Sequence, residues 1–218
     1  MKSNKLVSLI FVLAVMVITI TFSIGLPIYI RPFYYAHVDA LDMPETYGVE
    51  RQDVIDAYDE VLDFLTKDGY EFGTGVLAHS EEGKNHFVDC KFLFDLNKYA
   101  FIGAICVVIL LILLEKVGVV NLARPFGLPL SFFAGLMTLV LFAGLGFVVA
   151  KDFGSAFTTF HKIFFPGKDN WKFNPYTDPI ILFMPSKFFM NCAILICSSI
   201  LTVSVGLIIR GRNNRYTV

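Results

Sequence analysis

The stretch that decides the fold is "GLPLSFFAGLMTLVLFAGLGFVVA", residues 127–150, which carries no charged side chain. An apolar run needs roughly 17 to 25 residues to cross a bilayer as a helix, and this run is long enough. Similar runs occur elsewhere in the chain. Together they predict four membrane-spanning segments, at about residues 6–30, 99–114, 127–150 and 188–209.

The composition agrees with an integral membrane protein. Of the 218 residues, 56% are hydrophobic and 17% are charged, and the mean hydropathy is +0.65. A water-soluble domain of this composition would leave too much apolar surface exposed to water. The first run follows Lys2 and Lys5, as in a signal peptide, but it is longer than a signal-peptide core and no small-x-small cleavage site follows. We therefore expect a retained signal anchor.

The charges are distributed unequally between the two sides of the predicted spans. One side has a single acid, Glu115, and seven basic residues: Lys2, Lys5, Lys116, Arg124, Arg210, Arg212 and Arg215. The other side has eleven basic residues and eighteen acids. By the positive-inside rule, both termini are expected in the cytoplasm, and segments 31–98 and 151–187 outside. An acidic exterior of this kind argues against binding to nucleic acid.

The first external segment is long enough for a small folded cap. Residues 51–69, "RQDVIDAYDEVLDFLTKDG", place apolar side chains at helical spacing and predict an amphipathic helix that Gly69 ends. Residues 71–80 and 85–94 have the length and the aromatic or β-branched content of two short strands around a polar turn. The expected fold is therefore mainly α, a four-transmembrane-helix bundle with a small α+β extracytoplasmic cap, in one integral membrane domain, residues 1–218.

Histidine is the side chain that most readily exchanges protons near neutral pH, because its ordinary pKa is about 6.5. All four histidines, His37, His79, His86 and His161, lie in the predicted external segments. His37 and His79 are interpreted as solvated surface residues. His86 and His161 are expected at the depth of the bilayer surface, and Asp89 lies close to His86 in sequence. These two are the candidates for acid-base chemistry.

Several motifs are missing from the sequence. It has no GxSxG, HExxH, GxxxxGK[ST] or GxGxxG, which argues against a serine hydrolase, a metalloprotease, a nucleotide hydrolase and a dinucleotide enzyme. The predicted spans contain no carboxylate, which disfavours an intramembrane aspartyl protease or an ion transporter. The four cysteines form neither a CxxC pair nor a disulfide framework.

Two segments resemble a known family. They are "NHFVDCK", residues 85–91, and "FHKIFFPGKDNWKFNPYTDPIILFMPSKFF", residues 160–189, between the last two spans. They resemble the signature segments of the lipoprotein intramolecular transacylase family, called Lit, and the likeness extends over the whole chain in length, span count and span order. The resemblance implies an acyltransferase of the bacterial plasma membrane. It would move the sn-2 acyl chain of a diacylglyceryl lipoprotein onto the α-amine of that lipoprotein's N-terminal cysteine, giving a lyso-form lipoprotein.

The resemblance also implies site residues and partners. By motif, the family histidines correspond to His86 and His161, with no cofactor, no metal and no acyl-enzyme. The lipoprotein substrate and membrane lipid are the expected partners. Amine and ester belong to one molecule, so holding them close together supplies much of the rate. Supporting roles are expected for Asp89, which would orient His86, for Trp171, an interfacial anchor or substrate contact, and for Asp178, a cap of the turn into the last span.

Two other functions remain open at this point. One is a non-enzymatic tetraspan scaffold or pH sensor whose acidic external cap binds a partner. The other is a zinc-dependent membrane hydrolase that would use His86, Asp89 and His161, although these residues lack the compact spacing of most zinc sites.

Overall fold

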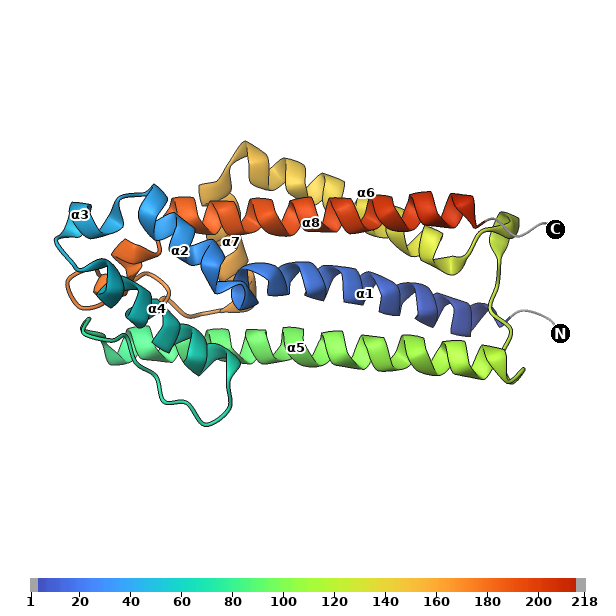
Figure 1. Ribbon diagram of the computed structural model, residues 1–218, viewed down its shortest axis with the longest axis horizontal. Helices are drawn as coiled ribbons and strands as arrows, with labels where there is room; N and C mark the ends of the chain where they lie inside the picture. The colour runs from blue at the N-terminus through green and yellow to red at the C-terminus, as the bar shows by residue number, and fades with distance from the viewer. Residues whose placement is uncertain (1–3, 215–218) are drawn as a thin grey trace. The chain divides into compact units, whose positions relative to one another are not determined.

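The computed structural model describes residues 4–214, except for the side chain of Val148 (Figure 1). Lys2 and Arg215, which entered the charge comparison, lie outside the described residues. The chain divides into two compact units. Unit 1 comprises Met1–Gly25, Asn97–Ala150 and Leu195–Val218, and unit 2 comprises Leu26–Leu96 and Lys151–Ile194.

Within residues 4–214, four helices are long and apolar enough to cross a membrane: α1 (Lys5–Tyr29), α5 (Glu81–Lys116), α6 (Leu130–Lys151) and α8 (Ser186–Asn213). Their number confirms the predicted number of spans. Helix α5 has 36 residues. At about 1.5 Å per residue it is roughly 54 Å long, well beyond the ~30 Å hydrocarbon core of a bilayer. The first half of α5, residues 81–98, contains all of its charged side chains except those at its C-terminal end. We call residues 81–98 the polar part of α5.

Unit 1 contains most of α1, the second half of α5, nearly all of α6 and the later part of α8, packed through small and polar side chains. The Ser23 hydroxyl of α1 donates to that of Ser199 in α8, at 3.0 Å. A Cβ on Gly135 of α6 would lie 2.7 Å from the Ser204 carbonyl of α8, so only glycine permits this approach. Close contact through small residues is the usual way in which helices associate in membranes. The start of α1, the end of α8 and the α5–α6 connection, which contains η1 (Pro125–Gly127), lie at the same end of unit 1 (Figure 1).

Unit 2 contains α2 (Arg31–Ala40), α3 (Met43–Tyr47), α4 (Arg51–Thr66), the polar part of α5, α7 (Phe153–Phe164), η2 (Pro179–Phe183) and the first residues of α8. Helix α4 confirms the predicted amphipathic helix. Its apolar face packs into a core in which Tyr34 and Tyr58 stack, with ring centroids 3.5 Å apart. The Tyr34 hydroxyl donates to the Phe183 carbonyl at 2.9 Å, so this buried polar group has a partner.

The predicted α+β cap is wrong, because residues 4–214 contain no strand and the cap is helical. Residues 71–80 are turns and irregular chain, and residues 85–94 belong to α5. The supposed polar turn is a helix start: the Ser80 hydroxyl accepts from the Gly83 amide at 3.0 Å, and two acids occupy the first turn. Phe87, Cys90 and Phe94 then recur at helical spacing and pack against the unit 2 core.

Candidate active site

Unit 2 brings His86 and His161 together. His86 lies in the polar part of α5, and His161 lies in the last turn of α7. Their ring centroids are 5.9 Å apart and the ring planes differ by 29°. Their exposed fractions are only 5% and 7%. Two histidines that are 75 positions apart in the printed sequence therefore form one buried pair.

Aromatic side chains surround this pair. Two rings lie against His161, Phe157 at 4.2 Å and Trp171 at 4.6 Å, and two against His86, Phe165 at 4.9 Å and Phe173 at 5.4 Å. Apolar walls of this kind remove water from the imidazoles and disfavour their charged form. Three of the four rings come from the segment that follows His161, so α7 and this segment build most of the site.

The surroundings keep both histidines neutral at pH 7. Burial, assisted by the neighbouring His161, lowers the pKa of His86 to about 4. Burial also lowers the pKa of His161, although the Phe157 carbonyl acts in the opposite direction. Both residues lie outside the apolar runs of the spanning helices, His86 because it belongs to the polar part of α5. A neutral imidazole is the form that accepts a proton, so the pair suits base chemistry at neutral pH.

The hydrogen bond of His161 determines which ring nitrogen carries the proton. Its Nδ1 lies 2.8 Å from the Phe157 carbonyl, one turn earlier in α7. A carbonyl oxygen only accepts, so in the neutral ring Nδ1 carries the hydrogen and donates it. The lone pair is then on Nε2. His161 therefore presents Nε2 as a base, in an orientation fixed by its own helix.

His86 has a different partner. Its Nε2 lies 3.4 Å from the Cys90 sulfur, one turn later in α5. Burial, with a smaller effect of the Asp89 charge, raises the pKa of Cys90 to about 12, so the thiol keeps its proton and can donate it to Nε2. The proton of neutral His86 is then on Nδ1, a buried atom with no hydrogen-bond partner among the described residues. Sequence reasoning missed Cys90, although its spacing of four from His86 is the signal that a helix would bring them together.

Asp89 does not hydrogen-bond to either histidine. It accepts from Lys168 Nζ at 2.6 Å and from Asn170 Nδ2 at 3.3 Å. Burial alone would raise the pKa of Asp89, but the two hydrogen bonds and the charge of Lys168 outweigh it and keep the pKa below its ordinary value. Asp89 thus ties the polar part of α5 to the segment after α7. Its negative charge also favours the protonated form of His86, and the expected orienting role remains a prediction.

The other two predicted supporting residues lie in different places. Trp171 packs its ring against His161, and its Nε1 donates to the Lys168 carbonyl at 3.1 Å. Asp178 is only 3% exposed and accepts from the amide and hydroxyl of Ser80, at 2.8 to 3.0 Å. It therefore holds the start of α5 instead of capping η2, to which its side chain makes no capping bond. A Cβ on Gly83 would lie 2.2 Å from the Asp178 carboxylate, so the contact requires glycine.

The other two histidines have structural partners outside the pair. His37 Nδ1 contacts the Phe33 carbonyl at 2.7 Å, and its Nε2 contacts Asn191 at 2.8 Å. The His79 ring lies 3.1 Å from the Thr74 hydroxyl. No group of three or more histidine, cysteine or acidic side chains within residues 4–214 is arranged to hold a metal ion.

Comparison with known proteins identifies the family. The model of the family described as "Lipoprotein intramolecular transacylase Lit" matches residues 9–189. A solved structure of the membrane integral lipoprotein intramolecular transacylase Lit from Bacillus cereus has a TM-score of 0.86 and 24% identity, covering 96% of this chain and 94% of that one. A structure of the same protein with a histidine replaced by arginine has a TM-score of 0.79, 24% identity and coverages of 96% and 91%. No curated protein matches the chain. The family match confirms the resemblance seen in the sequence: the chain belongs to the Lit family and is a lipoprotein intramolecular transacylase.

Proposed function

We propose that His86 and His161 carry out the transacylation by moving one proton from the amine to the departing oxygen. In the reaction, the α-amine of the lipid-bearing N-terminal cysteine attacks the sn-2 ester carbonyl. The new C–N bond forms, the C–O bond to glycerol breaks, and the lyso-form lipoprotein results. The single observation that carries the proposal is the buried, neutral pair with ring centroids 5.9 Å apart.

The hydrogen bonds of the pair suggest a division of roles. His161 is the base, because its Nδ1 is bonded to the Phe157 carbonyl and the Nε2 lone pair accepts the proton shed by the attacking amine. His86 is the donor, because Nδ1–H is the buried group with no partner, and it gives a proton to the glyceryl oxygen. The proton on His161 then restores His86, so the balance closes. Each such transfer typically contributes about 100-fold to 10,000-fold in rate.

No acyl-enzyme is needed in this scheme. The amine and the ester belong to one substrate, and holding them in contact replaces a bimolecular encounter, an effect worth about 7–11 kcal/mol in favourable cases. The buried thiol of Cys90 is a poor nucleophile, because the raised pKa keeps it protonated. In our proposal Cys90 selects the tautomer of His86 and takes no part in acyl transfer.

We also propose an orientation in the plasma membrane. The basic end of unit 1, with Lys5, Lys116 and Arg210, faces the cytoplasm. Because successive spans cross the membrane in opposite directions, segments 31–98 and 151–187, which contain the histidine pair, are then on the outer side, where diacylglyceryl lipoproteins are anchored. The acidic helix α4 belongs to the same unit as the pair and is placed outside with it.

The experiment is mass spectrometry of the N-terminal lipopeptide of a lipoprotein from cells that express each variant. His86→Ala and His161→Ala are expected to leave the diacyl form with a free amine, while membrane insertion is retained. His79→Ala is the matched control, because His79 is exposed and lies outside the pair, and it should give the wild-type lyso form. If His86→Ala and His161→Ala both give the lyso-form lipoprotein at the wild-type level, the proposal is rejected. That result would favour the non-enzymatic tetraspan scaffold or pH sensor.

A further inference from the structure

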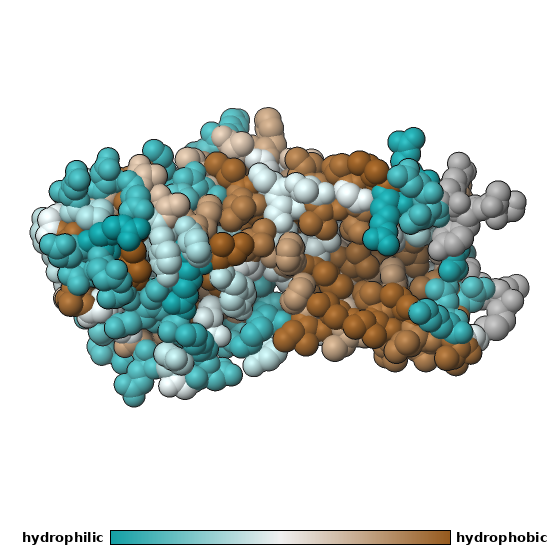
Figure 2. Space-filling model, viewed as in Figure 1, coloured by the Kyte–Doolittle hydropathy of each residue, from teal (hydrophilic) through white to brown (hydrophobic). Residues whose placement is uncertain are grey.

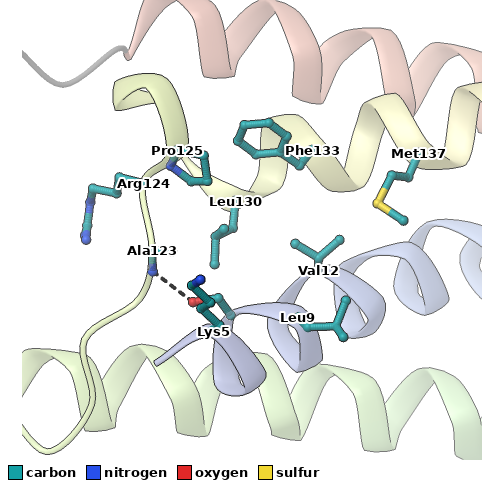
Figure 3. A pocket seen from close by; sticks show the side chains of 10 residues that line it. Lys5, Leu9, Val12, Ala123, Arg124, Pro125, Leu130, Phe133 and Met137 are labelled. Atoms are coloured by element: carbon teal, nitrogen blue, oxygen red, sulfur yellow. Dashed lines mark hydrogen bonds between the residues drawn. The ribbon is translucent and has the colours of Figure 1, made fainter. Parts of the chain in front are cut away.

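A second binding feature lies in unit 1, apart from every residue of the candidate active site. A hollow of about 530 Å³ lies between the first turns of α1, the segment that leads into η1, and α6 (Figure 3). Lys5 and Ala123 lie at one end of it and Met137 at the other (Figure 3). This volume is within the usual range of about 300–1,000 Å³ for small-molecule sites.

The wall of the hollow is mostly apolar. Leu9 and Val12 of α1 face Leu130, Phe133 and Met137 of α6. Both helices are membrane-spanning, so the surrounding medium is hydrocarbon and the walls offer few groups that bind water. The hollow is open on one side, so an apolar chain from the surrounding hydrocarbon can lie along its wall. The natural occupant is an acyl chain.

The rim of the hollow is basic. Lys5 makes no ion pair within the part of the chain that the structure describes. Arg124 lies beside it on the rim and pairs with Glu115 at 3.0 Å. Glu115 is the only acid at this end, against Lys5, Lys116, Arg124, Arg210 and Arg212 among the described residues. A negatively charged group is therefore attracted to the rim.

Hydrogen bonds connect two walls of the hollow. The Ala123 amide donates to the Ser8 hydroxyl at 2.8 Å, drawn as a dashed line in Figure 3. The Asn4 amide donates to the Asn121 carbonyl at 2.9 Å. These two bonds attach the α5–α6 connection to the first turns of α1. The wall is thus built before any ligand arrives, which reduces the ordering entropy lost on binding.

We propose that this hollow binds one anionic phospholipid of the surrounding leaflet, with an acyl chain along the α1–α6 wall and the phosphate beside Lys5. This lipid is distinct from the lipoprotein substrate, and the site shares no residue with the histidine pair. We infer an anionic headgroup because the rim is basic, and an acyl chain because the wall is apolar.

The test is native mass spectrometry of the purified full-length chain with equal amounts of dioleoyl phosphatidylglycerol and dioleoyl phosphatidylcholine. The wild type is expected to retain one phosphatidylglycerol per chain, about fivefold more often than phosphatidylcholine, since one cation near a lipid surface is worth ~1 kcal/mol. Lys5→Gln should remove this preference. Arg212→Gln, a cation at the same end that does not line the hollow, should leave it unchanged.

A matched pair of substitutions tests the wall. Leu9→Trp fills the hollow and should abolish retention of both lipids, whereas Leu13→Trp, on the same helix but outside the hollow, should not. The two leucines are 49% and 46% exposed, so neither substitution disturbs the core. Equal retention of the two lipids by the wild type, or equal binding by the two tryptophan variants, would overturn the proposal. Lyso-lipoprotein formation by these variants reports separately on the catalytic pair.

Discussion

Asp178→Ala removes the carboxylate that connects the segment before α8 to the start of α5. Three donors bond to this carboxylate, the amide and hydroxyl of Ser80 and the hydroxyl of Thr177, at distances between 2.6 and 3.0 Å. Hydrogen bonds to a charged group contribute about 1.5–3 kcal/mol each, and bonds that share one acceptor are not additive. We therefore expect a loss of about 3 kcal/mol. For a chain of this size, ~2–4 °C per kcal/mol gives a fall in Tm of roughly 6–12 °C.

The assay is thermal unfolding of the purified protein in detergent, followed by tryptophan fluorescence from the single Trp171. Asp178→Asn retains an acceptor oxygen without the charge and should lose less than the alanine variant. Asp169→Ala is the control from the same segment, because Asp169 is 81% exposed and its pair with Lys172 adds little. If Asp178→Ala melts within about 2 °C of Asp169→Ala, the carboxylate does not hold α5 as described and the reasoning fails.

Three further predictions concern the pH dependence, the helix contact and the loop. The pKa of His86 is lowered to about 4 in the folded state, so protons bind preferentially to the unfolded state as the pH falls below 6.5. The free energy of unfolding should therefore drop by about 2 kcal/mol between pH 7 and pH 5. Measurements of Tm at each pH test this, and the drop should be smaller in His86→Gln. Gly135→Leu places a side chain against the Ser204 carbonyl and should destabilise unit 1 by about 1–3 kcal/mol, visible as a lower Tm, whereas an unchanged Tm would mean that α6 and α8 are further apart than described. Lys168→Met removes the pair with Asp89 and should lower lyso-lipoprotein yield, with recovery in Lys168→Arg; equal yields in both variants would argue against a positioning role.

The spanning helices could be predicted because a continuous apolar run in the sequence is enough to identify each of them. A continuous apolar run such as residues 127–150 has a single low-energy arrangement in a bilayer, whatever the rest of the chain does. The family resemblance identified His86 and His161 as the site histidines but left open whether they meet, and no spacing rule in the sequence predicts that contact. Their contact depends on how α7 packs against α5, which is decided by side chains distributed over the whole unit.

The cap was mispredicted for a local reason. The length and the β-branched or aromatic content of residues 71–80 and 85–94 indicated two strands, and "EEGKN" between them indicated a turn, whereas Ser80 with two following acids is also typical of a helix start. The helix start is supported by Asp178, which is remote in sequence and bonds to Ser80 in the folded chain. Cys90 was overlooked for the same reason, since its contact with His86 exists only if residues 85–94 are helical.

Each imidazole of the pair is oriented by its own helix: His161 by a carbonyl one turn earlier in α7, and His86 by a thiol one turn later in α5. Different residues, Lys168 and Asn170, connect the segment after α7 to the polar part of α5 through their hydrogen bonds to Asp89. The orientation of each ring and the connection between the two elements that carry the rings therefore depend on different residues. We expect that lengthening the segment after α7 by one residue would change the distance between the rings without changing the hydrogen bond that orients either one. Under our proposal this would slow turnover, so that segment is a suitable place to alter the rate by engineering.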